Sequence, residues 1–149
     1  IYSVNVVGAY QMARAVAPHM KAQGRGSIVN TSSIPGVMGI GSSIAYAASK
    51  GAMNTMTLSL ARLLAPEIRV NAIAPGFITG RWWLERLGQE AYDKMVAGVE
   101  QSVPLNHAGT PEDMAETALF LLTNSANITG EILLCDSGHH LGGAPLIAR

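Results

Sequence analysis

Charged residues are scarce in this chain, and neither sign prevails. Asp, Glu, Lys and Arg make up only 13% of its 149 residues, and ten basic residues balance ten acidic ones. A chain without net charge has no general attraction to nucleic acid or to an anionic membrane, so we expect neither as a partner. No apolar run approaches the length that spans a bilayer. The 48% of hydrophobic residues exclude a disordered chain, and the length of 149 residues predicts one domain, or most of one.

Cysteine is nearly absent as well. The single cysteine, Cys135, cannot form an internal disulfide, and its place in the apolar run 132–135 predicts a buried structural thiol. This usage suits a reducing compartment, so we expect a cytoplasmic protein. His107, His139 and His140 form too sparse a pattern for zinc, and no metal site is expected.

Helical patterns alternate with short β-rich runs, which is typical of parallel β-α-β units. We expect helices over residues 1–23, 44–64, 82–100 and 111–122. We expect strands over residues 27–31, 68–74 and 131–135. Pro35 and the glycines after it predict a loop, whereas Thr110 followed by Pro111 and two acidic residues predicts a helix start.

Tyr46 and Lys50 stand four residues apart in one of these expected helices, so their side chains can converge on one face. A free phenol, with a pKa near ~10, trades protons poorly at neutral pH. A neighbouring cation favours the phenolate and can make a tyrosine a general acid or base. The pair alone is weak, because a tyrosine and a surface lysine at this spacing also occur by chance on solvated helices.

Two further motifs accompany the pair. Ser32-Ser33 follow the first expected strand, and the run from Asn71 to Gly76 ends the second. In this order the motifs resemble those of the classical short-chain dehydrogenase/reductases, especially the branch of 3-oxoacyl-carrier-protein reductases and glucose or steroid dehydrogenases. The resemblance covers nearly the whole chain, from residues 3–8 to residues 128–131 and 136–138.

The resemblance implies a doubly wound, Rossmann-like α/β domain with a parallel sheet. Family members open with a strand, a glycine-rich turn and a helix that hold the cofactor's pyrophosphate, and no G-x-G-x-x-G occurs here. We therefore expect residues 1–149 to be the C-terminal portion of one such domain, with the N-terminal half missing. The first strand would then lack its partner, and we do not expect the segment to fold stably or to be active alone.

Catalytic roles follow from the same resemblance. Tyr46 is implied to transfer the proton at the substrate oxygen, and Ser33, thirteen positions before it, to hold that oxygen. Ser32 competes for the latter role and is read as a strand-end residue. Lys50 is implied to assist Tyr46 and to bind the nicotinamide ribose. Asn5, an unusual residue inside an apolar helical pattern, is implied to bind a water on the proton path.

The cofactor is expected to be NAD or NADP, which the sequence does not discriminate because the residue that contacts the adenosine ribose is absent. The implied cofactor-binding residues are Tyr46, Lys50, Pro75, Gly76, Ile78 and Thr79. Thr79 departs from the family pattern, in which the threonine usually lies two residues beyond the position of Ile78.

The expected function is hydride transfer between nicotinamide and a small alcohol or ketone, in an NAD(P)-dependent oxidoreductase. A non-catalytic dinucleotide-binding module and an epimerase or dehydratase of the extended group are the alternatives. Residues 80–104, with Trp82, Trp83 and Leu87, are expected to form a substrate flap or to pack on the core. The helix 44–64 has more apolar positions than one core-facing stripe needs, which predicts a homodimer or homotetramer.

Overall fold

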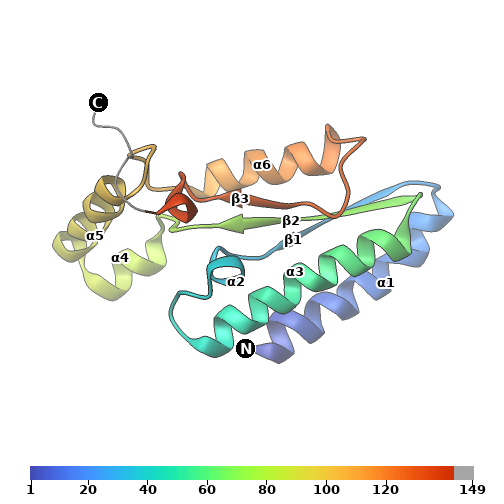
Figure 1. The fold of residues 1–149 in the computed structure, drawn as a ribbon, viewed down its shortest axis with the longest axis horizontal. Helices are drawn as coiled ribbons and strands as arrows, with labels where there is room; N and C mark the ends of the chain where they lie inside the picture. Colours follow the sequence, from blue (N-terminus) through green and yellow to red (C-terminus); the bar gives the residue numbers. More distant parts are fainter. Residues whose placement is uncertain (143–149) are drawn as a thin grey trace.

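The structure is a computed structural model, and it describes residues 1–142. Its centre is a parallel sheet of three strands in the order β1-β2-β3 (Figure 1). The strands are β1 (Gly26–Thr31), β2 (Ile68–Pro75) and β3 (Ile132–Cys135). The middle strand β2 is covered on both faces, and its residues Val70, Asn71, Ala72 and Ala74 are fully buried. The parallel α/β arrangement expected from the sequence is confirmed.

Helices cover both faces of this sheet. In Figure 1, α1 (Ala9–Ala22) and α3 (Ile44–Leu64) lie along one face, and α6 (Pro111–Thr123) lies along the other. Two helices, α4 (Arg81–Leu87) and α5 (Gln89–Ser102), lie beyond the carboxyl ends of the strands. The short elements are the π-helix η1 (Ser3–Gly8), α2 (Pro35–Met38) and the 3₁₀-helix η2 (His139–Leu141).

The main hydrophobic core lies between the sheet and the pair α1 and α3. Small alanines of α1, Ala13 and Ala17, are buried against Leu60 and Leu64 of α3 and allow the two helices to approach closely. Ile68 and Val70 complete this cluster from the sheet. The core is thus built where α3 is apolar, near its C-terminal end, and it leaves the N-terminal half of α3 free to carry polar groups.

The structure corrects three expected elements. The helix expected over 82–100 is two helices, separated at Gly88, whose φ of 77° is a conformation that favours glycine. The loop expected at Pro35 contains the helical turn α2, because a proline is well suited to a first helical position. The first helix begins with the π-helical turn η1, and no residue pattern had indicated it.

Both edges of the sheet are open within residues 1–142, because β1 and β3 each pair only with β2. Large apolar side chains are also exposed, on the first helix (Val4, Val7, Met12) and on α6 (Leu119, Phe120). The sheet therefore has the unpaired first strand that the sequence predicts. No helix among these residues is long and apolar enough to cross a membrane.

Candidate active site

The start of α3 brings Tyr46 and Lys50 together. Ser43 caps the helix, since its hydroxyl accepts a hydrogen bond of 3.2 Å from the Tyr46 backbone N–H. The Lys50 ammonium lies 5.6 Å from the centre of the Tyr46 ring. Tyr46 is half-buried and Lys50 is buried. The two side chains share one helix face, as the four-residue spacing predicts.

Lys50 is an unusual lysine because it is only 8% exposed. Its Nζ donates a hydrogen bond of 2.8 Å to the carbonyl of Thr31, the last residue of β1. Desolvation by burial lowers the pKa of Lys50 from its ordinary value. A buried cation therefore stands beside a tyrosine at the carboxyl end of a parallel strand, where ligands bind in doubly wound sheets.

The two serines after β1 face in different directions. Ser33 is buried, and its Oγ donates to the carbonyl of Pro75 at 3.3 Å, across the ends of β1 and β2. Ser32 turns toward α3, where its hydroxyl contacts Asn54 Oδ1 at 2.5 Å and the Lys50 carbonyl at 3.3 Å. Ser33 is thus the serine beside the Pro75 segment, and Ser32 is a structural contact of the helix.

Asn5 lies within η1 and reaches α3. Its Nδ2 donates to Ser49 Oγ at 3.0 Å, and Ser49 Oγ donates to the Tyr46 carbonyl at 2.7 Å. Ser49 is fully buried, whereas Asn5 is half-buried. Local π-helical turns occur frequently at functional sites, and here the turn presents Asn5 to the helix that carries Tyr46. Ser49 was not predicted as a site residue, because its only signal in the sequence was its position between Tyr46 and Lys50.

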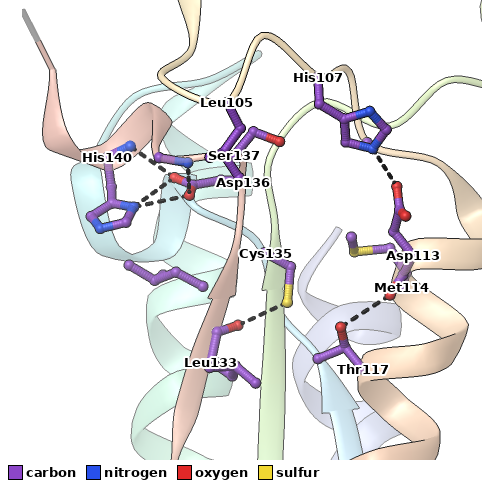
Figure 2. A pocket seen from close by; sticks show the side chains of 13 residues that line it. Leu105, His107, Asp113, Met114, Thr117, Leu133, Cys135, Asp136, Ser137 and His140 are labelled. Atoms are coloured by element: carbon purple, nitrogen blue, oxygen red, sulfur yellow. Dashed lines mark hydrogen bonds and ion pairs between the residues drawn. The ribbon is translucent and has the colours of Figure 1, made fainter.

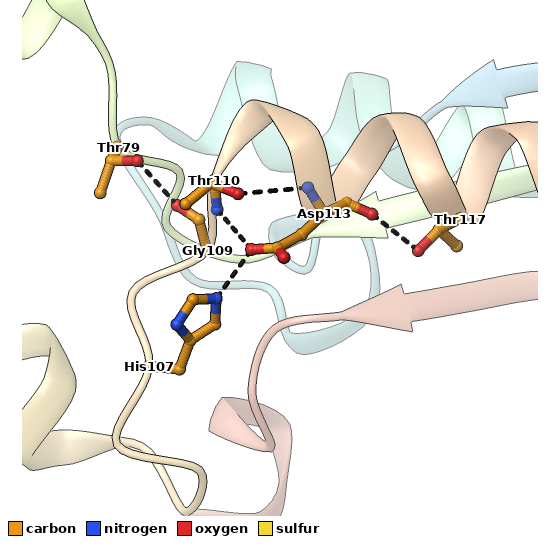
Figure 3. A network of polar contacts seen from close by, with 6 residues as sticks. All are labelled: Thr79, His107, Gly109, Thr110, Asp113 and Thr117. Carbon is orange, nitrogen blue, oxygen red and sulfur yellow. Dashed lines mark hydrogen bonds and ion pairs between the residues drawn. The ribbon is translucent and has the colours of Figure 1, made fainter.

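The Pro75–Gly76 segment ends β2 beside β3. A side chain at Gly76 would place its Cβ 2.8 Å from the Asp136 Cβ, so only glycine fits there. After this point the chain turns away: Ile78 forms a bridge with Gly109, and Thr79 N–H and Oγ1 both donate to the Gly109 carbonyl, at 2.8 and 3.1 Å (Figure 3). The structure therefore places Pro75 next to Ser33, whereas it holds Thr79 against the segment before α6.

A polar network closes this segment, and Figure 3 shows its members converging at the start of α6. Thr110 and Asp113 form the reciprocal capping box, and His107 Nε2 lies 2.7 Å from Asp113 Oδ2. The hydrogen bond with His107, followed by those with Thr110, lowers the pKa of Asp113 to about 2. The predicted helix start is confirmed, but the role of His107 in it was missed.

A cavity of about 360 Å³ lies on the α6 side of the sheet (Figure 2). His107 and Asp113 line one side of it, Asp136 and His140 line the other, and Cys135 lies between them. It contains none of the four residues expected to be catalytic. Cys135 is only half-buried, which corrects the expectation of a buried thiol, and burial raises its pKa, which disfavours the reactive thiolate.

Asp136 and His140 are tied to each other. The side chain of Asp136 is 2% exposed, and His140 Nδ1 lies 2.9 Å from its Oδ1. Burial acts to raise the pKa of Asp136, but hydrogen bonds from His140 and Gly138 outweigh it and lower this pKa overall. Among residues 1–142, no group of three or more His, Cys, Asp and Glu side chains is placed to hold a metal ion. The Asp136 turn is a structural feature that supports Gly76.

Comparison with known proteins identifies the class. The chain belongs to the short-chain dehydrogenase/reductase family. The family model described as Enoyl-(Acyl carrier protein) reductase matches residues 1–140. A short-chain dehydrogenase/reductase homolog of Bacillus subtilis is 43% identical over 134 residues, which cover 90% of this chain and 98% of that protein. The granaticin polyketide synthase putative ketoacyl reductase 2 of Streptomyces violaceoruber is 41% identical over 141 residues, or 95% of this chain.

The match to longer relatives is partial. The chain spans 55% of the Streptomyces protein, and about half the length of most curated relatives it matches. A solved structure of the Thermoplasma acidophilum aldohexose dehydrogenase superimposes with a TM-score of 0.90 at 28% identity, over 100% of this chain and 61% of that one. The structure of ElxO with NADP bound matches with a TM-score of 0.83 at 30% identity. The match covers 92% of this chain and 55% of the ElxO chain. A 4-hydroxyisoleucine dehydrogenase complexed with NADH matches with a TM-score of 0.81 at 27% identity. The match covers 96% of this chain and 59% of the dehydrogenase chain.

Proposed function

We propose that the complete domain, meaning this chain together with a dinucleotide-binding half, is an NAD(P)-dependent oxidoreductase acting on a small alcohol or ketone. The observation that carries the proposal is the buried Lys50 beside Tyr46, with Ser33 at the carboxyl end of the neighbouring strand. Membership of the family and the NADP- and NADH-bound structural relatives support the same class of reaction.

The residues present fit a nicotinamide cofactor. Lys50 Nζ has three N–H donors, and the Thr31 carbonyl accepts one of them, which leaves two for ribose hydroxyls. The backbone of Pro75 and Gly76 lies at the carboxyl end of β2, where ligands bind in doubly wound sheets, and Ile78 follows two residues later. The bound cofactor would supply or accept the hydride. NAD and NADP are both compatible with these contacts.

The chain's own residues would handle the proton and the substrate oxygen. In the reductive direction, a hydride adds to the carbonyl carbon while Tyr46 Oη gives its proton to the oxygen; oxidation reverses both transfers. Ser33 Oγ, which donates to the Pro75 carbonyl in this structure, would donate to the substrate oxygen instead. The Lys50 ammonium would stabilise the Tyr46 phenolate. Asn5, which contacts α3 through Ser49, would bind a water on the path of the proton to solvent.

Residues 80–104 are proposed to cover the substrate. Trp83 lies 4.5 Å from Trp82 and 5.9 Å from Phe77, between ring centres, so an aromatic cluster follows directly after the Pro75 segment. Trp82 is 59% exposed. An exposed aromatic surface on two short helices that pack mainly on each other is suited to closing over a ligand and excluding water.

Two other functions compete with this proposal. A non-catalytic module could use Lys50 to bind the ribose, but it would have no need for Tyr46 and Ser33 together with Lys50. A relative from Xanthobacter autotrophicus described as an inactive 2-(S)-hydroxypropyl-CoM dehydrogenase 2 is 39% identical over 144 residues, so family membership alone does not decide. An epimerase would return the hydride to its own product and consume no cofactor overall.

A deuterium-transfer experiment separates the three functions. The complete domain is incubated with the reduced cofactor labelled at C4 and a panel of probe ketones, ethyl acetoacetate and trans-1-decalone among them. We expect deuterium on the carbinol carbon of the product, with one cofactor oxidised for each alcohol formed. Label found only in solvent, or reduced cofactor that binds and is never oxidised with any ketone of the panel, would contradict the proposal.

A further inference from the structure

A side chain of α3 with no part in the proposed chemistry fastens the Ser33 loop to the catalytic helix. Asn54 lies one helical turn beyond Lys50. Its Nδ2 donates to the Gly36 carbonyl at 3.1 Å, and its Oδ1 accepts from Ser32 Oγ at 2.5 Å. The Gly36 carbonyl can only accept a hydrogen bond, so the amide must present its NH₂ group to it.

The two contacts of Asn54 enclose Ser33. Ser32 directly precedes it, and Gly36 N–H donates to the Ser33 carbonyl at 3.0 Å. Both ends of this short turn are therefore held by one amide side chain. Tyr46 and Lys50 belong to the same helix as Asn54. The amide therefore fixes the position of Ser33 relative to Tyr46 and Lys50.

The turn of residues 32–36 packs closely against α3. A Cβ at Gly36 would lie 2.6 Å from the backbone carbon of Lys50, so α2 rests directly on the backbone of α3. The connection that follows, residues 39–43, is exposed and contains Gly39 and Gly41, both with positive φ. That connection gives the turn no rigid support from its C-terminal side. The Asn54 amide supports the turn instead, through its two side-chain hydrogen bonds.

We infer that Asn54 is a positioning residue, which sets the distance of Ser33 Oγ from Tyr46 by holding residues 32–36 in register on α3. The inference rests on the proposed function, because the position of Ser33 matters only if Ser33 holds the substrate oxygen. Misplacement of a catalytic group by about 1 Å can lower a rate by ~10²-fold. Loss of the Asn54 amide therefore lowers turnover and leaves dinucleotide affinity unchanged.

The test compares two substitutions in the complete domain, assayed with NADPH or NADH and the panel ketone that turns over fastest. Asn54→Leu keeps the size of the side chain and removes both hydrogen bonds, and we expect kcat to fall by at least ~10-fold with an unchanged cofactor Kd. Asn54→Asp keeps the acceptor for Ser32 but sets a carboxylate oxygen against the Gly36 carbonyl, so its kcat should also fall by at least ~10-fold. Thr57→Val is the matched control: it removes the 2.9 Å hydrogen bond from Asn30 one turn further along α3 and should lower Tm without lowering kcat.

A double-mutant cycle then asks whether Asn54 acts through Ser33. In a Ser33→Ala background, we expect Asn54→Leu to cause less than a ~2-fold further loss, because interacting residues are non-additive. Full turnover of Asn54→Leu, or an equal loss in both backgrounds, would overturn the inference. Should Asn54→Leu fail to fold, Asn54→Asp carries the same cycle. Normal turnover of Ser33→Ala alone is a separate failure, which removes the substrate-oxygen contact from the proposed function and the inference with it.

Discussion

Lys50 shows how a single residue can be placed at a cost to stability. Its ammonium is 8% exposed and has a lowered pKa because burial strips it of water. One backbone carbonyl, that of Thr31, accepts a hydrogen bond from it. A lysine in such a position is retained more readily for what its charge does than for what it adds to packing.

Replacing this lysine tests its two proposed roles together. In the complete domain, Lys50→Met should lower turnover by at least ~10²-fold, because Tyr46 loses the cation that favours its phenolate. It should also weaken dinucleotide binding by at least ~10-fold, since each hydrogen bond from a charged group contributes about 1.5–3 kcal/mol. Steady-state kinetics and fluorescence titration measure the two effects. Lys21→Met, at the exposed end of α1, is the control, and unchanged cofactor affinity in Lys50→Met would contradict the ribose-binding role.

At the scale of elements, the sequence predicts what depends on local patterns. The helix start at Thr110, the parallel strands and the shared face of Tyr46 and Lys50 all follow from spacing and composition, and all are found. The break at Gly88 was missed because a helical pattern continues on both sides of it. The contacts of Asn54 with the Ser33 turn were missed because they join residues distant in the chain, and no local pattern records such a contact.

The start of α6 should respond to acid. The folded pKa of Asp113 is about 2, below its ordinary value of 3.8, so the unfolded chain binds this proton more readily than the folded one. The stabilising contribution of Asp113 is therefore complete above about pH 4 and is lost as the pH falls toward 2. Denaturant unfolding between pH 6 and pH 2 measures the free energy of unfolding of the wild type and of Asp113→Asn. The difference between the two should shrink as the pH falls. A difference independent of pH would contradict this, and Glu112→Gln serves as the control for loss of a neighbouring carboxylate.

At the scale of the whole molecule, unpartnered surfaces dominate. No G-x-G-x-x-G motif for a dinucleotide's pyrophosphate occurs in these 149 residues, and β1 has a free edge within residues 1–142. Of the apolar positions of α3, Met53 and Leu60 are buried in the chain's own core, whereas Ala45 and Ala48 are exposed. The surplus apolar face is thus narrower than the full set of apolar positions, and it combines small alanines with the large side chains Ile44 and Leu63.

This narrower face still predicts assembly. Exposed alanines allow a second helix to approach closely, and Ile44 and Leu63 of α3 are 91% and 70% exposed. We expect the complete domain to form a symmetric homodimer or homotetramer, and Ala48→Arg to shift it toward smaller species by placing a large charge at the contact. Light scattering at micromolar concentration measures both. A wild-type protein that is only monomeric would contradict the expectation and leave the catalytic proposal unaffected.

The most direct test of the central claim is the turnover of Tyr46→Phe in the complete domain. The substitution keeps the ring beside Lys50 and removes only the hydroxyl that is proposed to exchange a proton with the substrate oxygen. We predict that kcat falls by at least ~10²-fold, the usual contribution of general acid–base catalysis, while the Kd for the dinucleotide stays within ~2-fold of the wild-type value. Turnover close to the wild-type rate would contradict the account, because Tyr46 would then not be the group that transfers the proton.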